Sequence, residues 1–351
     1  MGRDIPGDAV LCDVLTGYLG SGKTTLLNRY LRGSEASGTA VIVNEIGAIG
    51  VDHLILGEVS DNVVLLDSGC LCCSLTGSLR ETLLDLYLQA ERINISLKKV
   101  VIETTGLAEP LPILHALIGD RMLKERFALR CVIVTVDGQQ ALEQLANRKE
   151  TARQVAVADV LVITKADLAS PTTLEALKVA LSAINGCAAQ IDSSSPGAVN
   201  EAFDTSLENH NFIRQTLQIG QGPYLERSHR VSLGGQPIGA ESFWISEPTT
   251  WPGIAAWWNL LVTHYGKNLL RCKGLLSLAD QPSIVLLQGV GTYLHKPEML
   301  GAWPGGDDRA RLTVIGEGLD RQWLASSLRA LRLVEPGLLP TTLAELDQLG
   351  T

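Results

Sequence analysis

A phosphate-binding pattern is the sequence feature that most constrains the fold of this chain. Residues 17–24 read GYLGSGKT and fit G-x-x-x-x-G-K-[ST], directly after an apolar run (9–16) and before a helical pattern (23–32). Glycines let such a loop turn tightly so that its N–H groups point at phosphate oxygens, and the helix adds its positive end. The strand–loop–helix setting makes the match specific. A glycine-rich turn with a chance lysine is the competing interpretation.

The side chains of this loop have predicted roles. We expect Lys23 to pair with the β- and γ-phosphates and to act in catalysis, and the Thr24 hydroxyl to ligate Mg²⁺. The residues expected to bind the nucleotide in this segment are Gly17, Gly20, Ser21, Gly22, Lys23, Thr24 and Thr25.

Alternating strand and helix patterns over the first 200 residues predict an α/β fold. Near-continuous apolar, β-branched runs separated by helices are typical of a parallel sheet covered on both faces. The expected strands are 9–16, 39–44, 63–66, 99–104, 130–137 and 159–164, and expected helices include 23–32, 78–93 and 172–184. We therefore predict a P-loop NTPase domain with a mostly parallel sheet.

A change of pattern divides the chain at about residue 205. The stretch DSSSPGAVNEAFD (192–204) is typical of a connection, and all six tryptophans follow it. Mixed strand and helix signals, such as 282–290 and 320–334, predict a smaller α+β domain whose core most of the tryptophans build. The predicted organisation is a P-loop domain (1–205), a linker (206–228) and a C-terminal domain (229–351).

Two further strand ends carry candidate nucleotide contacts. In ETTG (103–106), a carboxylate at Glu103 can hold the Mg²⁺ shell or its water, and Gly106 lets the backbone approach the γ-phosphate. In TKAD (164–167), Asp167 can accept from both donors of guanine, while Lys165 can lay its alkyl stem along the base and Thr164 completes the motif. Ordinary strand-end turns are the alternative at both places. The order of the three motifs favours GTP.

Three neighbouring thiols form the second unusual feature. GCLCC (69–73) places Cys70, Cys72 and Cys73 after a strand pattern, without a second cysteine pair to close a structural zinc knuckle. We expect an open, exchangeable site that uses the three thiolates and one distant carboxylate or water. Such ligands suit Zn²⁺ and also accept Co²⁺, Fe²⁺ or Cu⁺. A redox pair and plain packing remain the alternatives.

The loop VNEIGAIGVD (43–52) is the expected place of a nucleotide-dependent switch. Glu45 leaves the preceding strand, and it could touch Mg²⁺, the attacking water or the thiolate metal. If Glu45 responds to both the γ-phosphate side and the cysteines, hydrolysis would change metal affinity. A solvated loop carboxylate is the alternative.

Composition excludes several function classes. The net charge of −9 argues against a nucleic-acid or anionic-membrane surface. No secretory signal or membrane-spanning run is recognisable, and an odd number of cysteines (seven) predicts reduced thiols in a cytoplasmic protein. Cys12 and Cys131 lie in strand-like runs and are expected in the core.

These residues resemble the CobW-type metallochaperone GTPases. The matching stretches in the N-terminal part are 15–28, 44–52, 69–73, 100–110 and 163–167, and 269–294 resembles the family's C-terminal domain more loosely. The resemblance implies a slow, Mg²⁺-dependent GTPase whose Cys-x-Cys-Cys motif binds Zn²⁺ or Co²⁺, and which couples GTP hydrolysis to metal delivery to a client metalloprotein. Two departures are Ala48, where many members have an acidic residue, and Thr164, where many GTPases have Asn.

Other functions stay open at this point. The chain could be a regulatory binding module that GTP and metal control, or an activator of a nitrile hydratase or of a cobalamin-pathway enzyme. A thiol redox sensor is a third interpretation. The expected ligands are GTP, GDP, Mg²⁺ and Zn²⁺ or Co²⁺, and a homodimer is one assembly that the chain could form.

Overall fold

The structure is a computed structural model that describes residues 9–43, 64–67, 75–203, 229–231, 237–281, 283–303 and 308–349. The chain divides into two compact units. One comprises 4–179 with 188–206, and the other comprises 207–351 with 180–187 and the first three residues. Each unit contains its own sheet and its own apolar core.

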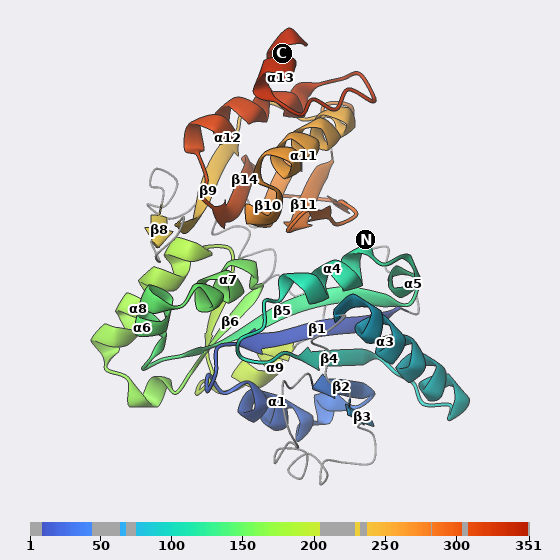
Figure 1. Cartoon of the computed structure of the whole chain (residues 1–351), viewed down its shortest axis with the longest axis vertical. Coiled ribbons are helices and arrows are strands. Elements are labelled where there is room, and N and C mark those ends of the chain that lie inside the picture. Colours follow the sequence, from blue (N-terminus) through green and yellow to red (C-terminus); the bar gives the residue numbers. More distant parts are fainter. Residues whose placement is uncertain are drawn as a thin grey trace. The chain divides into compact units, whose positions relative to one another are not determined.

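The first unit is built on a parallel sheet of seven described strands, in the order β3-β2-β4-β1-β5-β6-β7 (Figure 1). The strands are β1 (Val10–Gly17), β2 (Thr39–Val43), β3 (Val64–Asp67), β4 (Lys99–Glu103), β5 (Phe127–Asp137), β6 (Val160–Thr164) and β7 (Ala189–Asp192). Six of them match the predicted strands within a few residues. The sequence analysis did not predict β7, a short strand at the sheet edge whose residues alternate in polarity.

Helices cover both faces of this sheet (Figure 1). They are α1 (Lys23–Leu31), α3 (Leu75–Arg92), α4 (Leu111–Gly119), α5 (Arg121–Lys124), α6 (Ala141–Asn147), α7 (Lys149–Val157), α8 (Pro171–Ile184) and α9 (Ala198–Phe203), with short 3₁₀ turns η1 (Ser34–Ala36) and η2 (Ala166–Leu168). Alternate residues of β1 face opposite sides: Leu15 packs in the core under α1 and α9, while Val14 is buried outside that cluster. Burial on both faces explains the continuous apolar runs of the strands.

The parallel register brings four strand ends to one edge of the sheet. β1 ends at Gly17, β4 at Glu103, β5 at Asp137 and β6 at Thr164. Gly17 lies opposite Thr135 of β5, and Leu15 lies opposite Glu103 of β4. In open parallel sheets this carboxyl edge is where ligands bind. The three sequence motifs therefore meet at one place.

The stretch 192–204 is more than the connection that its composition predicted. Residues 198–203 form α9, and Phe203 stacks on Tyr30 of α1 with ring centroids 4.3 Å apart. The physical reason is the apolar face of AVNEAF, in which Ala198, Val199, Ala202 and Phe203 are all buried.

A buried ionic cluster supports the same region. Asp13, in the middle of β1, is fully buried and pairs with the Arg130 guanidinium and with Lys99 Nζ, 3.5 Å away. The Lys99 ammonium also donates to the Phe203 carbonyl at 2.6 Å. Because a buried charge is costly without partners, this cluster fixes α9 against the sheet.

The second unit has an antiparallel sheet in the order β12-β11-β10-β14-β9-β8, with β13 paired to β11. Its elements are β8 (His229–Val231), β9 (Ile238–Ile245), α11 (Trp251–Tyr265), η4 (Gly266–Asn268), β10 (Leu269–Ser277), β11 (Ile284–Val290), β12 (Tyr293–Leu294), β13 (Glu298–Leu300), β14 (Ala310–Glu317), α12 (Arg321–Ser327), η6 (Leu328–Arg332) and α13 (Leu343–Gln348). The predicted fold class, a P-loop α/β unit followed by a smaller α+β unit, is confirmed.

The tryptophans of the second unit differ in burial. Trp257 is fully buried in the main core and donates to the Ser327 hydroxyl at 3.1 Å, and Trp258 and Trp323 pack against that core. Trp303 packs on a smaller cluster, whereas Trp251 is 38% exposed. The helix predicted over 320–334 is α-helical only as far as Ser327 and continues as a 3₁₀ turn.

Candidate nucleotide site

The loop between β1 and α1 has the backbone of a phosphate-binding loop. Gly17, Gly20 and Gly22 have φ values of 143°, 71° and 88°, in the region that favours glycine. A Cβ on Gly17 would lie 2.4 Å from the Thr135 carbonyl oxygen, so no larger residue fits there without a shift. The loop delivers the chain into the first turn of α1, whose N-terminal N–H groups attract anions.

Lys23 lies folded over this loop. Its ammonium donates to the carbonyls of Gly17 at 2.9 Å and Tyr18 at 3.3 Å. Burial lowers the pKa of Lys23, and the negative charge of Glu103 opposes that effect. The arrangement places a positive charge on the phosphate side of the loop.

Thr24 and Glu103 form the pair that could hold a divalent cation. The Thr24 hydroxyl donates to Glu103 Oε1 at 2.7 Å, and Glu103 is 4% exposed at the end of β4. Hydroxyl and carboxylate oxygens beside a phosphate loop are ligands that Mg²⁺ prefers, so the residues fit this ion. The other two loop residues differ: Thr25 is exposed, whereas the buried Ser21 hydroxyl bonds Thr135 Oγ1 at 2.6 Å.

The ETTG segment packs directly on the phosphate loop. A Cβ on Gly106 would lie 2.5 Å from the backbone nitrogen of Leu19, which explains the need for glycine at this position. The Thr104 hydroxyl donates to Thr16 Oγ1 of β1 at 2.7 Å. The structure therefore brings Glu103 and Gly106 together with Lys23 and Thr24.

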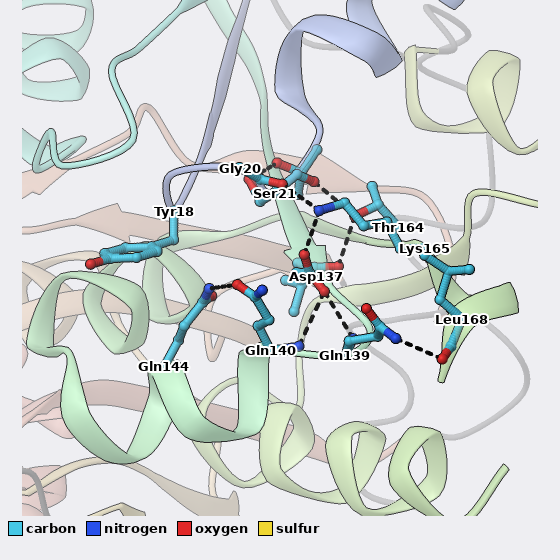
Figure 2. A network of polar contacts seen from close by, with 12 residues as sticks. Tyr18, Gly20, Ser21, Asp137, Gln139, Gln140, Gln144, Thr164, Lys165 and Leu168 are labelled. Atoms are coloured by element: carbon cyan, nitrogen blue, oxygen red, sulfur yellow. Dashed lines mark hydrogen bonds and ion pairs between the residues drawn. The ribbon is translucent and has the colours of Figure 1, made fainter. Parts of the chain in front are cut away.

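The TKAD segment also contacts the phosphate loop, through Thr164 and Lys165 (Figure 2). Lys165 has a φ of 53°, and its ammonium donates to the Gly20 carbonyl at 2.8 Å and to Asp137 Oδ2 at 2.7 Å. The Thr164 hydroxyl donates to the Ser21 carbonyl at 2.7 Å. Thr164, in the position where many GTPases have Asn, thus bonds the phosphate loop. Asp167 is exposed in η2, and its contact with guanine stays a prediction.

Asp137 is a site residue that the sequence analysis missed. It ends β5, is 2% exposed, and accepts from the N–H groups of Gln139 (2.9 Å) and Gln140 (3.1 Å) as well as from Lys165 (Figure 2). Burial would raise the pKa of Asp137, but the hydrogen bonds from Lys165 and these two N–H groups lower it overall. Its place at a strand end, beside the other motif strands, was the available signal.

Several predicted residues lie outside the described part of the chain. These are the thiols Cys70, Cys72 and Cys73, and the loop residues Glu45 and Ala48. Within the described residues, no group of three His, Cys, Asp or Glu side chains could hold a metal ion. Cys12 and Cys131 are buried, as expected. Among the helices that are described, none is long and apolar enough to cross a membrane.

The chain is similar to known proteins over nearly its whole length. Residues 11–192 match the family "CobW/HypB/UreG, nucleotide-binding domain", and residues 239–332 match "Cobalamin synthesis protein cobW C-terminal domain". The chain is 29% identical to the zinc chaperone YjiA of Escherichia coli, over 91% of this chain and 98% of that protein. It is 27% identical to the zinc chaperone CobW of Pseudomonas aeruginosa, over 90% of each.

A solved structure supports the same relationship. The Zn(II)-bound YjiA GTPase from E. coli superposes with a TM-score of 0.66 at 25% identity, and covers 93% of this chain and 99% of that one. The phosphate loop, the Thr24–Glu103 pair and the TKAD segment occupy one sheet edge, and all three lie within the matched residues 11–192. This chain belongs to the CobW-type metallochaperone GTPase family.

Proposed function

We propose that this protein uses GTP hydrolysis to control the binding of a transition metal, Zn²⁺ in the first place, and its delivery to a client metalloprotein. The observation that carries the proposal is the contact between the ETTG segment and the phosphate loop, in which Gly106 lies against Leu19 and Glu103 bonds Thr24. This contact joins the predicted γ-phosphate sensor, Glu103 and Gly106, to the phosphate loop. The zinc chaperones among the relatives support zinc as the cargo.

Each of the predicted site residues has its own role in the proposed hydrolysis. Lys23 neutralises the β- and γ-phosphates, and Gly106 offers its backbone to the γ-phosphate. Thr24 and Glu103 would hold Mg²⁺, which when bound offsets the charge that develops on the phosphate oxygens. Lys165 holds the guanine-side segment to the loop through Gly20, so that Asp167 can accept from the base. Glu45 would orient the attacking water.

The cargo site in this proposal consists of Cys70, Cys72 and Cys73, with Glu45 as the distant carboxylate. Thiolates bind Zn²⁺ and Co²⁺ tightly, and dissociation of the fourth ligand, Glu45, would open a position through which the ion can leave. Because Glu45 would serve both the phosphate side and the metal, loss of the γ-phosphate would weaken the cargo site.

We also propose the organisation of the molecule around this cycle. The GTPase domain spans 1–205, the linker 206–228 and the C-terminal domain 229–351. In this proposal the protein acts in the cytoplasm, where it docks to the client metalloprotein. It binds neither nucleic acid nor a membrane.

Steady-state GTP hydrolysis tests the proposal directly. Wild-type protein and Cys72→Ser are compared with and without Zn²⁺, after full reduction. We expect Zn²⁺ to change the kcat of the wild type severalfold and to leave the kcat of Cys72→Ser unchanged. A wild-type rate that is indifferent to Zn²⁺ would favour the regulatory-module interpretation. A thiol redox sensor would instead show altered oxidation in Cys72→Ser with an unaltered metal-dependent rate.

A further inference from the structure

The loop 104–109 after β4 is held from two sides. On one side lie β1 and the phosphate loop, through the Thr104–Thr16 hydroxyl contact of 2.7 Å and the packing of Gly106 on Leu19. On the other side lies α7, the helix that precedes β6. The residues of α7 that contact the loop, Arg153 and Gln154, belong to none of the motifs.

Gln154 of α7 makes the central contact. Its side-chain amide nitrogen donates to the carbonyls of Gly106 at 3.2 Å and Ala108 at 3.1 Å, so both amide hydrogens can be used. Gln154 is 1% exposed, which protects these bonds from competition with water. The preceding residue, Arg153, pairs with Glu109 at the end of the same loop. Two adjacent side chains of one helix therefore hold three loop residues.

The orientation of the Gly106 carbonyl has a consequence for the neighbouring peptide group. A trans peptide bond places its C=O and N–H on opposite sides. Since the Gly106 carbonyl points at α7, the N–H of Leu107 points away from α7. Gln154 thus fixes the orientation of the peptide group that follows Gly106, the residue proposed to approach the γ-phosphate.

We infer that Gln154 is a positioning residue that sets the preference of the site for GTP over GDP. It does so by holding the loop 104–109 in the conformation that accepts the γ-phosphate. The inference rests on the proposed role of Gly106 at the γ-phosphate. A glutamine that merely satisfied two buried carbonyls would affect GTP and GDP binding equally, because it would act through the stability of the whole unit.

The test is the affinity of the full chain for a fluorescent, non-hydrolysable GTP analogue and for GDP, both with Mg²⁺ and without transition metal. In Gln154→Leu we expect affinity for the GTP analogue to fall about tenfold, roughly the effect of one to two lost neutral hydrogen bonds. Affinity for GDP should stay within about twofold, because GDP lacks the group that the loop contacts.

Val155→Ala is the matched control. Val155 is the next residue of α7 and is fully buried, so its truncation loosens the helix without removing the amide of Gln154. This variant should melt at a lower temperature and keep the wild-type ratio of the two affinities. Gln154→Asn is a milder variant whose shorter side chain cannot reach both carbonyls. The same affinities are measured on it if Gln154→Leu does not fold.

The inference is overturned if the Gln154 variants keep the wild-type ratio of GTP-analogue affinity to GDP affinity, whether or not both affinities fall. It is also overturned if Val155→Ala shifts the ratio as much as Gln154→Leu does. Because no transition metal enters this titration, failure of the proposed metal coupling would leave the result unaffected.

Discussion

At the scale of single residues, the phosphate loop is held by side chains from two other strands. Ser21 bonds Thr135 of β5, and Thr164 of β6 bonds the Ser21 carbonyl. Lys165 completes the set through its contacts with Gly20 and Asp137. The conformation of the phosphate loop is thus coupled to the TKAD segment, which we propose contacts the base.

Replacement of Asp137 by Asn tests this coupling. The change removes the charge that attracts Lys165, while an amide oxygen can still accept from Gln139 and Gln140. The Lys165 side chain is 40% exposed, so solvent screens part of the interaction and we expect a loss of roughly fivefold to tenfold in GDP affinity. Isothermal titration calorimetry measures the GDP affinity of the wild type and of the variant.

The matched control for this variant is Asp192→Asn. Asp192 ends β7 at the same sheet edge and accepts from the Ser194 N–H at 2.9 Å, without a lysine partner in the contacts described for it. It should bind GDP as the wild type does. Equal affinity in Asp137→Asn and wild type would show that the ion pair has no part in nucleotide binding.

Replacement of Gly106 by Ala tests the close approach of the two loops. The added methyl group would meet the Leu19 backbone at 2.5 Å, and backbone atoms cannot move aside cheaply. We expect kcat/KM for GTP hydrolysis to fall at least about tenfold, which corresponds to about 1.4 kcal/mol. Gly301→Ala, where a Cβ meets nothing within 4 Å, should hydrolyse GTP normally. Wild-type turnover in Gly106→Ala would contradict the proposed loop contact.

At the scale of elements, the first unit is also stabilised outside the nucleotide site, by α9 and by the buried ionic cluster of Asp13, Lys99 and Arg130. Burial lowers the pKa of Lys99 to about 8, although the Asp13 carboxylate opposes that shift. Its ordinary pKa is 10.5, so between pH 8 and 10.5 the unfolded chain binds more protons than the folded chain does. The contribution of Lys99 to stability therefore rises with pH in this window.

Lys99→Met tests this pH dependence by urea unfolding between pH 7.5 and 10. The difference in unfolding free energy, wild type minus variant, should increase with pH, by at most about 3 kcal/mol over the full window. The physical reason is that the wild type is relieved of a buried positive charge, whereas the variant has none to lose. A difference that stays flat or decreases would contradict the assigned protonation.

The sequence predicted the elements whose signal is local. Continuous apolar runs revealed six strands of the parallel sheet, because strands buried on both faces cannot carry alternating polar residues. It did not reveal β7, a four-residue edge strand, or α9, whose six residues follow a Ser, Pro and Gly stretch. Short elements form through tertiary contacts, here the stacking of Phe203 on Tyr30, and not through their own propensity.

The candidate site was predictable where a motif places chemistry in consecutive residues. Lys23, Thr24, Glu103, Gly106 and Lys165 were all named, and the structure brings them to one edge. Asp137 and Gln154 were missed because the contacts that tie them to the motif residues span 28 to 48 residues in sequence and form through strand order and helix packing. Apart from the position of Asp137 at a strand end, such contacts leave no local pattern.

At the scale of the whole molecule, the proposed function requires one coupling, between the nucleotide state and the thiolate site. The described residues supply the nucleotide half: a phosphate loop, a candidate Mg²⁺ pair and a loop fixed by Gln154. Cys70, Cys72, Cys73 and Glu45 supply the proposed cargo half. A chain in which the two halves acted separately would be a GTPase with an unrelated thiol site.

The most direct test is a competition titration of Zn²⁺ and Co²⁺ against a chelator of known affinity, on reduced protein with Mg²⁺–GTP analogue or Mg²⁺–GDP. We expect one metal ion per chain and an affinity that is at least about tenfold higher with the GTP analogue, a coupling of about 1.4 kcal/mol. Equal metal affinity in the two nucleotide states would contradict it.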